Sequence, residues 1–237
     1  MDEFNQFLRS YIAPREKTEL LVFAEENKIP IINPEVEQFL RVILSVLKPN
    51  RILEIGAAIG YSASFFLEAT GADVTTIEID GEKCEIALQF LKRITNNEKR
   101  ITIEEFAGAN SIVGAHRVRP RATGTVAPTG AIRIIHGDAW EVLPTLNEQY
   151  DFIFLDSSKS HYHEYLEDLV RLLATGGMLV CDNVLFKGKV ITPEYPEKKH
   201  RTTVRHLREF LKMISEHPKL TTSILPIGDG ISVSIKA

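Results

Sequence analysis

The chain has 237 residues, of which 44% are hydrophobic and 25% are charged, and its formal net charge is −4 at pH 7. This composition is typical of a soluble globular protein with one large domain, or one domain with appendages. No apolar run is long enough to span a membrane, and the acidic, amphipathic amino terminus is unlike a secretory signal. Cys84 and Cys181 are the two cysteines and form no CxxC pattern, so they indicate neither a disulfide scaffold nor a zinc site. We expect a cytoplasmic enzyme with no membrane partner.

Residues 1–50 have apolar side chains at helical spacing and predict an amino-terminal helical cap. Its first two helices are expected over 2–12 and roughly 16–27. A third begins at Pro34, which suits the first turn of a helix, and Pro49 stops it.

Residues 51–237 alternate between short apolar runs and helical patterns, and predict one α/β domain. The runs are β-branched, as in strands buried on both faces of a parallel sheet, and lie at 51–55, 73–79, 131–137, 151–156 and 177–182. Helices are expected between and after them near 62–70, 81–95, 139–146, 161–174 and 200–216. Little more than Gly228-Asp229 separates the last two strands, 221–227 and 230–236, which predicts an antiparallel hairpin. The predicted fold is a doubly wound, Rossmann-like sheet of about seven strands, mostly parallel, with ligands outside the carboxyl ends of its strands.

One segment, at about 98–130, is too long for a connection between a helix and a strand, which usually has about 2–6 residues. Its first part, 100–106, can form an extra strand. The rest is rich in Gly, Ala, Thr and Pro and carries three arginines: Arg117, Arg119 and Arg121. A surface insertion, a flap over an active site and a basic arm for a polyanionic substrate are all consistent with this composition.

The stretch RILEIGAAIGYS, residues 51–62, predicts a strand, a turn between Gly56 and Gly60, and the start of a helix. Glycine at such positions lets a ligand approach the main chain closely, and the free N–H groups of the helix start face that ligand. A plain strand-to-helix turn and a nucleotide-type cofactor loop both fit this stretch when it is taken alone.

Acidic residues then close two of the strands. Glu78 follows the glycine turn by one strand and one helix, where an acid can accept hydrogen bonds from both ribose hydroxyls of an adenosine cofactor. In the sequence HGDA, Asp138 can accept from an adenine amino group while the Ala139 N–H binds a ring nitrogen. The alternatives are a solvated strand-end acid for Glu78 and a helix N-cap for Asp138, and the cap is compatible with the adenine contact.

The next two strands end in Asp156 and in Asp182-Asn183. Two carboxylates and an amide oxygen on neighbouring strand ends suit Mg²⁺ or a similar hard cation rather than zinc. Without a cation, such a buried group of like charges is costly. The sequence therefore predicts a divalent metal site here.

Lys159 lies three residues after Asp156 and can reach the same cavity. A cation beside this lysine would disfavour its protonated form and lower its pKa, which suits a general base. The alternative is a surface lysine that pairs with Asp156.

Six stretches occur in the order of a known family: LEIGAAIGYSA, TTIEID, HGDA, FLDSSKSHY, CDNVLFKG and PIGDGISVS. The chain resembles the metal- and S-adenosylmethionine-dependent O-methyltransferases of the catechol and caffeoyl-CoA type over nearly its whole length, except at about 98–130. Within that family, FAEENKIPI, DNVLFKGKV and the tail from HPKLTTSILPIGDG onward are most similar to the bacterial tRNA 5-hydroxyuridine methyltransferases.

This resemblance implies roles for individual residues. The implied metal ligands are Asp156, Asp182 and Asn183, with Mg²⁺ as the expected metal, and Lys159 and Asp156 are the implied catalytic residues. The positions implied to bind S-adenosylmethionine are Ile31, Glu54, Gly56, Tyr61, Ser62, Glu78, Asp138, Ala139 and Asp156. The resemblance also implies a homodimer.

The expected reaction is methyl transfer from S-adenosylmethionine to a hydroxyl oxygen that the metal and Lys159 activate. We favour 5-hydroxyuridine in a tRNA anticodon stem-loop as the acceptor because the narrower resemblance implies it. The nine Lys and Arg against four Glu in 187–219 also suit phosphate contacts. The main alternative is a small catechol or caffeoyl-CoA-type acceptor, since both substrates carry two adjacent oxygens. A third alternative is an RNA-binding module that has lost its chemistry.

Overall fold

The structure is a computed structural model that describes residues 2–12, 14–95, 99–106, 108, 130–192 and 197–237. Its strands are β1 (Arg51–Ile55), β2 (Asp73–Glu78), β3 (Ile101–Glu105), β4 (Ile132–His136), β5 (Tyr150–Leu155), β6 (Leu173–Cys181), β7 (Leu220–Leu225) and β8 (Ile231–Lys236). Its α-helices are α1 (Asp2–Arg9), α2 (Glu19–Glu26), α3 (Pro34–Leu47), α4 (Tyr61–Thr70), α5 (Gly81–Ile94), α6 (Ala139–Val142), α7 (Tyr162–Leu172) and α8 (Arg201–Glu216). Short 3₁₀ turns lie at Leu143–Thr145, Lys159–His161 and Lys198–His200.

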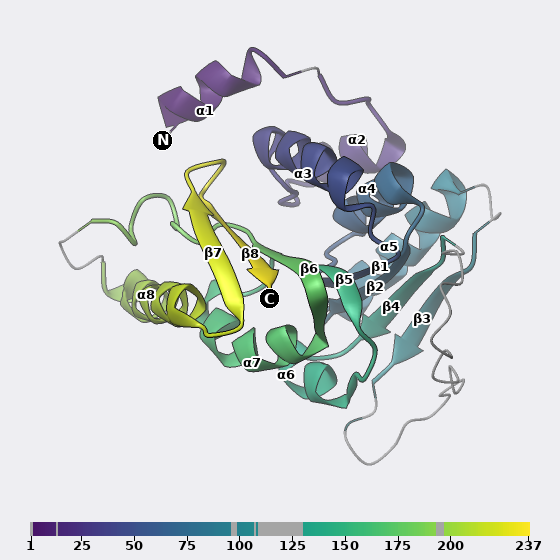
Figure 1. Cartoon of the computed structure of the whole chain (residues 1–237). Helices are drawn as coiled ribbons and strands as arrows, with labels where there is room; N and C mark the ends of the chain where they lie inside the picture. Colours follow the sequence, from purple (N-terminus) through teal and green to yellow (C-terminus); the bar gives the residue numbers. More distant parts are fainter. Residues whose placement is uncertain (1, 13, 96–98, 107, 109–129, 193–196) are drawn as a thin grey trace.

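The strands form one sheet in the order β3-β4-β2-β1-β5-β6-β8-β7 (Figure 1). Neighbouring strands from β3 to β6 run parallel, whereas β8 is antiparallel to both β6 and β7. The sheet is doubly wound from β1, so the carboxyl ends of β1, β2, β4, β5 and β6 meet at one edge.

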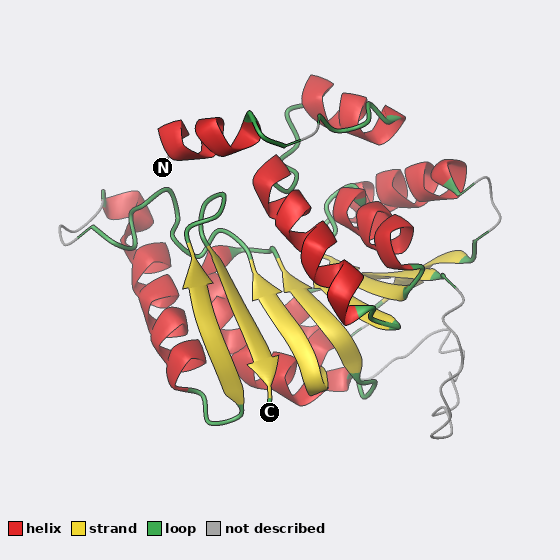
Figure 2. Cartoon of the chain, turned by 45° about the horizontal axis from the view of Figure 1, so that its top comes forward, coloured by secondary structure: helices red, strands yellow, loops and turns green. Residues whose placement is uncertain are grey.

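Helices cover the two faces of the sheet (Figure 2). One apolar core joins the sheet to α6, α7 and α8, and its largest members include Tyr162 and Phe210. The other joins it to α3, α4 and α5 around Phe66, Phe152 and Phe154. Because β1 and β5 are covered on both sides, almost every residue in them is buried, as expected for central parallel strands.

The predicted fold class is confirmed, with one correction. The extra strand that residues 100–106 could form is present as β3, which pairs with β4 and brings the sheet to eight strands. The helix predicted over 161–174 ends at Leu172, and β6 begins at Leu173 rather than 177. Leu173 is extended and pairs with Tyr150 across a register irregularity, a tertiary pairing that helical periodicity does not reveal.

Most of the long segment at about 98–130 lies outside the described residues. Within the parts of the chain that the structure describes, no helix is long and apolar enough to cross a membrane.

Candidate active site

A cavity of about 1600 Å³ opens at the sheet edge where the parallel strands end. Nine of the predicted site residues line it: Ile31, Gly56, Glu78, Asp138, Ala139, Asp156, Lys159, Asp182 and Asn183. They come from positions up to 152 residues apart in the chain, from Ile31 to Asn183. The sheet brings them together because its ladder of hydrogen bonds continues past the strands: Asp156 N–H donates to Ile55 O at 3.0 Å, and Asp182 N–H to Leu155 O at 2.9 Å.

Glu78 closes β2 and is 8% exposed. Its Oε2 accepts from the Ala58 N–H at 2.8 Å and its Oε1 from the Asp80 N–H at 3.0 Å. These bonds fix the carboxylate between the glycine turn and the start of α5, and each oxygen keeps a lone pair for another donor. The arrangement suits an acid that accepts from a pair of neighbouring hydroxyls, such as those of a ribose.

The glycine turn lies directly against the end of β5. Gly56 has a φ of +100°, and a Cβ added to it would lie 2.2 Å from the Asp156 carbonyl oxygen. Gly60 has a φ of +82° and starts α4. A side chain at position 56 would therefore clash with the residue that both the metal and cofactor predictions use.

Asp138 and Ala139 line the cavity at the end of β4. The Asp138 side chain accepts from the Trp140 N–H at 2.9 Å, so its predicted role as a helix cap is confirmed. Its second oxygen is left for a ligand. Trp140 also lines the cavity, is 57% exposed, and offers an aromatic surface next to this position.

Asp156, Asp182 and Asn183 follow the neighbouring strands β5 and β6. Asp182 is 1% exposed, and its Oδ1 accepts from the Asn183 N–H at 2.7 Å. Asn183 has a φ of 56°, in the left-handed region that Asn enters more readily than most residues. No cluster of three or more His, Cys, Asp or Glu able to hold a metal occurs among the described residues, so the candidate ligand set is two carboxylates and one amide.

The electrostatics of Asp182 fit a cation site. Burial, followed by the negative charge of Asp156, raises the pKa of Asp182 to about 7. A buried carboxylate next to a second carboxylate is unfavourable unless positive charge compensates both. Carboxylate and amide oxygens are the hard donors that Mg²⁺ and similar cations take, so these residues fit the predicted metal.

Lys159 Nζ lies 2.5 Å from Asp156 Oδ1, and the two side chains are 18% and 25% exposed. This ion pair with Asp156 is the predicted alternative to a catalytic role for Lys159. Because both residues line the cavity, the pair places an ammonium group beside the candidate metal ligands. The same Nζ lies 5.6 Å from the centre of the Tyr162 ring.

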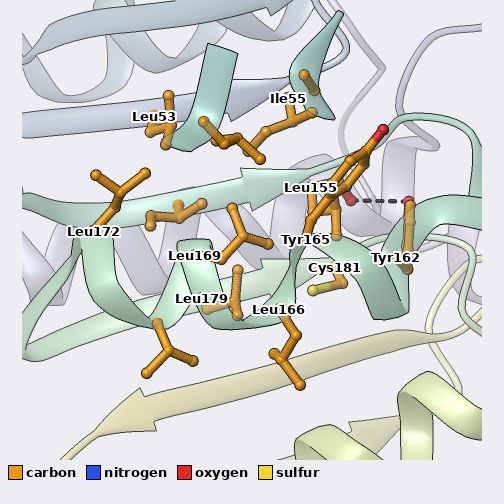
Figure 3. Packing of buried hydrophobic residues seen from close by; sticks show 14 of the residues in the cluster. Leu53, Ile55, Leu155, Tyr162, Tyr165, Leu166, Leu169, Leu172, Leu179 and Cys181 are labelled. Carbon is orange, nitrogen blue, oxygen red and sulfur yellow. Dashed lines mark hydrogen bonds between the residues drawn. The ribbon is translucent and has the colours of Figure 1, made fainter. Parts of the chain in front are cut away.

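Tyr162 holds the ends of β5 and β6 together, and Figure 3 shows its hydrogen bond to Leu155 at the end of β5. It is completely buried, and its Oη lies 3.1 Å from Leu155 O and 3.0 Å from Asp182 O, so its proton is shared between two main-chain carbonyls. These carbonyls belong to the residue before Asp156 and to Asp182 itself. Tyr162 is therefore a positioning residue for the candidate metal site.

Three predicted cofactor-binding residues lie outside the lining of the cavity. Glu54 is fully buried and accepts from Ser62 Oγ and, at 2.6 Å, from Thr76 Oγ1. Tyr61 lines a second cavity of about 640 Å³ and donates to Glu37 Oε2 at 3.0 Å. The cofactor-binding roles predicted for Glu54, Tyr61 and Ser62 stay predictions. For this turn to contact the cofactor, either its main chain makes the contact or these side chains move.

Several lining residues were not predicted. They include Asn5, Arg9, Asn33, Gly228 and Asp229. The sequence gives no signal for Asn5 and Arg9, which come near the other lining residues only through tertiary contacts. Gly228 and Asp229 belong to the PIGDG stretch, whose position in the family pattern was the only available signal.

Comparison with known proteins decides the family. The sequence model of the O-methyltransferase family matches residues 15–112 and 124–237. The chain belongs to the O-methyltransferase family. It is 26% identical to caffeoyl-CoA O-methyltransferase 5 from Nicotiana tabacum, over 97% of this chain and 89% of the relative, and 28% identical to caffeoyl-CoA O-methyltransferase from Medicago sativa, over 98% and 84%.

The structure of a Podospora anserina methyltransferase with bound S-adenosylhomocysteine has the same fold as this O-methyltransferase. The TM-score is 0.74 at 21% identity, with 100% of this chain and 96% of the other covered. The resemblance of the sequence to O-methyltransferases of the caffeoyl-CoA type is thus confirmed. These relatives carry caffeoyl-CoA rather than tRNA in their names, so the narrower resemblance stays a prediction.

Proposed function

We propose that this O-methyltransferase uses S-adenosylmethionine and a divalent cation to methylate a small aromatic acceptor with two adjacent oxygens. The observation that carries the proposal is the set of buried and partly buried oxygen ligands Asp156, Asp182 and Asn183, next to Lys159, on the cavity that Glu78 also lines. The names of the curated relatives favour a small acceptor of the caffeoyl-CoA kind over the tRNA that the sequence led us to favour.

The two halves of the cavity have different tasks in this proposal. Glu78, Asp138 and the main chain after Gly56 hold the cofactor at the ends of β1, β2 and β4. Asp156, Asp182 and Asn183 hold the cation at the ends of β5 and β6. Alignment of the acceptor oxygen with the methyl group then follows from the fixed spacing of the strand ends.

When bound, the cation favours the ionised form of the acceptor hydroxyl, and S-adenosylmethionine supplies the methyl group. Asp156 and Asp182 would hold the cation, and Lys159 would accept the hydroxyl proton at Nζ after its own proton has left for the solvent. Tyr162 fixes the main chain next to Asp156 and at Asp182 through its two hydrogen bonds, and Asp156 orients Lys159. Loss of any of these contacts should lower turnover more than it lowers cofactor binding.

The test is methyl transfer to catechol and to caffeoyl-CoA with Mg²⁺, with EDTA, and with Lys159→Met. We expect a methylated product only with metal, and a rate at least about 100-fold lower for Lys159→Met, in line with the loss of a general base. Lys83, which lines the cavity and pairs with Asp80 at 3.2 Å, gives the control variant Lys83→Met. Metal-independent transfer would contradict the proposal.

A tRNA acceptor containing 5-hydroxyuridine is the second candidate, and basic residues near the cavity favour it. Lys187 lines the cavity, while Lys198, Lys199 and Arg201 lie in the turn before α8 and at its first residue. Arg208 supports this candidate less, because its guanidinium donates to Val190 O at 3.0 Å and to Thr192 O at 2.5 Å.

The salt dependence of methyl transfer distinguishes the two candidate acceptors. Methyl transfer to an anticodon stem-loop bearing 5-hydroxyuridine should weaken steeply between about 50 and 200 mM salt, whereas transfer to a neutral catechol should not. Under our proposal the catechol is the better acceptor. A stem-loop that is methylated efficiently, with a rate that falls when Lys198 and Lys199 are changed to Glu, would favour tRNA.

We also propose a homodimer, as the resemblance implies. Val42 and Val46, one turn apart on α3, are 55% and 79% exposed and provide an apolar surface for such an association. Light scattering of the purified chain should give twice the monomer mass of 26.7 kDa.

A further inference from the structure

Helix α8 binds the turn that carries Lys159, which we call the Lys159 turn (157–161). The helix packs beside α7 on one face of the sheet (Figure 1). Nδ1 of His206, in α8, lies 2.8 Å from the main-chain oxygen of Ser160, across 46 residues of sequence. Ser160 directly follows Lys159 in the sequence. A side chain of α8 therefore holds the main chain next to the proposed general base.

The hydrogen bonds of His206 assign its protonation form. A main-chain carbonyl can only accept, so Nδ1 must carry the proton that is donated to Ser160. Nε2 lies 3.2 Å from Nη2 of Arg205, and because a guanidinium can only donate, Nε2 must be the acceptor. His206 is therefore a neutral imidazole with its proton on Nδ1, and both of its ring nitrogens have partners.

The helix that carries His206 is itself fixed near this residue. The ring of His163, on α7, lies against the His206 ring, with 4.3 Å between the ring centroids. Two residues further along α8, the Arg208 guanidinium donates to Thr192 O at 2.5 Å, and Thr192 lines the cavity. These contacts join α8 to α7 and to a second loop of the cavity, so the Nδ1–H of His206 has a defined place.

The Lys159 turn is held by the sheet at its two ends. Asp156 precedes the turn and continues the hydrogen bonds of β5, and Tyr162 follows it and bonds to two main-chain carbonyls. The bond from His206 adds a tie to another element in the middle of the turn. It fixes the main chain from which Nζ of Lys159 reaches Asp156 at 2.5 Å.

We propose that His206 is a positioning residue for Lys159: its Nδ1–H holds the Ser160 carbonyl and so keeps the Lys159 amine beside Asp156. The proposal rests on the proposed function, because it concerns the base of the same reaction. Catalysis depends on such placement, since a displacement of about 1 Å can lower a rate by about 100-fold. Loss of one hydrogen bond corresponds to a change of about five- to tenfold in the fraction of molecules with Lys159 in place.

The first test follows the amine without turnover. Acetic anhydride acetylates a free amine faster than an ammonium group that is bound to a carboxylate, and mass spectrometry gives the rate at each lysine. In EDTA and without cofactor, Lys159 should react about five- to tenfold faster in His206→Leu than in the wild type, relative to Lys83 in the same sample. His206→Asn should restore the slow rate, because the asparagine NH₂ can donate in place of Nδ1–H.

The second test is methyl transfer to catechol with Mg²⁺. His206→Leu should lower kcat about five- to tenfold and leave the dissociation constant of S-adenosylhomocysteine unchanged, because His206 lies outside the cavity lining. His206→Asn should restore kcat. In the Lys159→Met background, His206→Leu should lower kcat no further, since a positioning residue acts only through the residue that it positions.

His217→Leu is the matched control. His217 follows the other end of α8, and its Nε2 lies 3.6 Å from Oε1 of Glu167 on α7. This change loosens the contact between the two helices away from the Lys159 turn, so it should lower the stability to urea but leave kcat and the acetylation of Lys159 unchanged.

Two results would overturn the proposal: wild-type acetylation of Lys159 in His206→Leu, or equal effects of His206→Leu and His217→Leu on that acetylation. If the wild type does not methylate catechol, the proposed acceptor class fails, while the acetylation of Lys159 still decides the role of His206.

Discussion

At the scale of the residue, the carboxylate of Glu54 lies beneath the glycine turn without contact with solvent. Burial raises the pKa of Glu54 to about 7, against the hydrogen bonds from Ser62 and Thr76 that lower it. Its neighbours Asp156 and Glu78 are both acidic and add to the upward shift. The Glu54 carboxyl therefore keeps its proton to a higher pH than an exposed glutamate does.

The pH dependence of stability follows from this shift. The folded state binds the Glu54 proton more tightly than the unfolded state, so the resulting stability is complete below pH 4.5 and is lost as the pH rises through about 7. The Glu54→Gln variant has no carboxyl at this position to ionise, so its stability does not fall for this reason. Its unfolding free energy relative to wild type should rise by up to about 3 kcal/mol between pH 4.5 and 8.

Urea unfolding at several pH values, without ligand, measures this difference. Glu68→Gln, at an exposed position of α4, is the control and should show no comparable slope. A difference between Glu54→Gln and wild type that does not change with pH would contradict the prediction.

At the scale of the element, the contact between the β1–α4 turn and the end of β5 leaves no room for a side chain at position 56. Gly56→Ala introduces a methyl group at φ +100° and 2.2 Å from the Asp156 carbonyl. The turn and the strand end must separate, which should weaken S-adenosylhomocysteine binding at least about tenfold and destabilise the fold by more than about 2 kcal/mol.

Gly71 is the matched control for this change. It has a φ of +69° at the end of α4, but a methyl group there would meet nothing within 4 Å. Gly71→Ala should cost about 1 kcal/mol in urea unfolding and leave the cofactor affinity, measured by calorimetry, intact. Equal losses of affinity in the two variants would show that strain, rather than the contact with Asp156, is responsible.

The same elements show how far sequence can predict this site. Strand β1 was predicted with its observed limits because a run of buried, branched residues is bounded by Pro49-Asn50 and Gly56. Asp156 and Asp182 could be placed on one edge because parallel strands end together. Asn5 could not, since its contact with Gly228 joins the two ends of the chain. The side-chain positions of Glu54 and Tyr61 also escaped prediction, because spacing does not tell which side of a turn a side chain occupies.

At the scale of the whole molecule, the sheet separates the two candidate binding sites. In our proposal, the adenosine side uses the ends of β1, β2 and β4, and the cation side uses the ends of β5 and β6, all of which border the same cavity. The two sites meet at Asp156, which touches the turn after β1 and follows β5. Cofactor and cation should therefore bind with separable contributions to stability.

Thermal unfolding can resolve these contributions. At about 100 times its dissociation constant a ligand adds about 2.7 kcal/mol, which raises the melting temperature of a chain of this size by about 5–10 °C. S-adenosylhomocysteine should produce such a rise in EDTA, and Mg²⁺ should add its own. Asp182→Ala should lose the Mg²⁺ increment and methyl transfer but keep the rise from S-adenosylhomocysteine, because Asp182 lies on the cation side only. Asp168→Ala, at a residue that pairs with Arg171 outside the cavity lining, should keep both increments. If Asp182→Ala abolishes both, the division of the cavity into a cofactor side and a cation side is wrong.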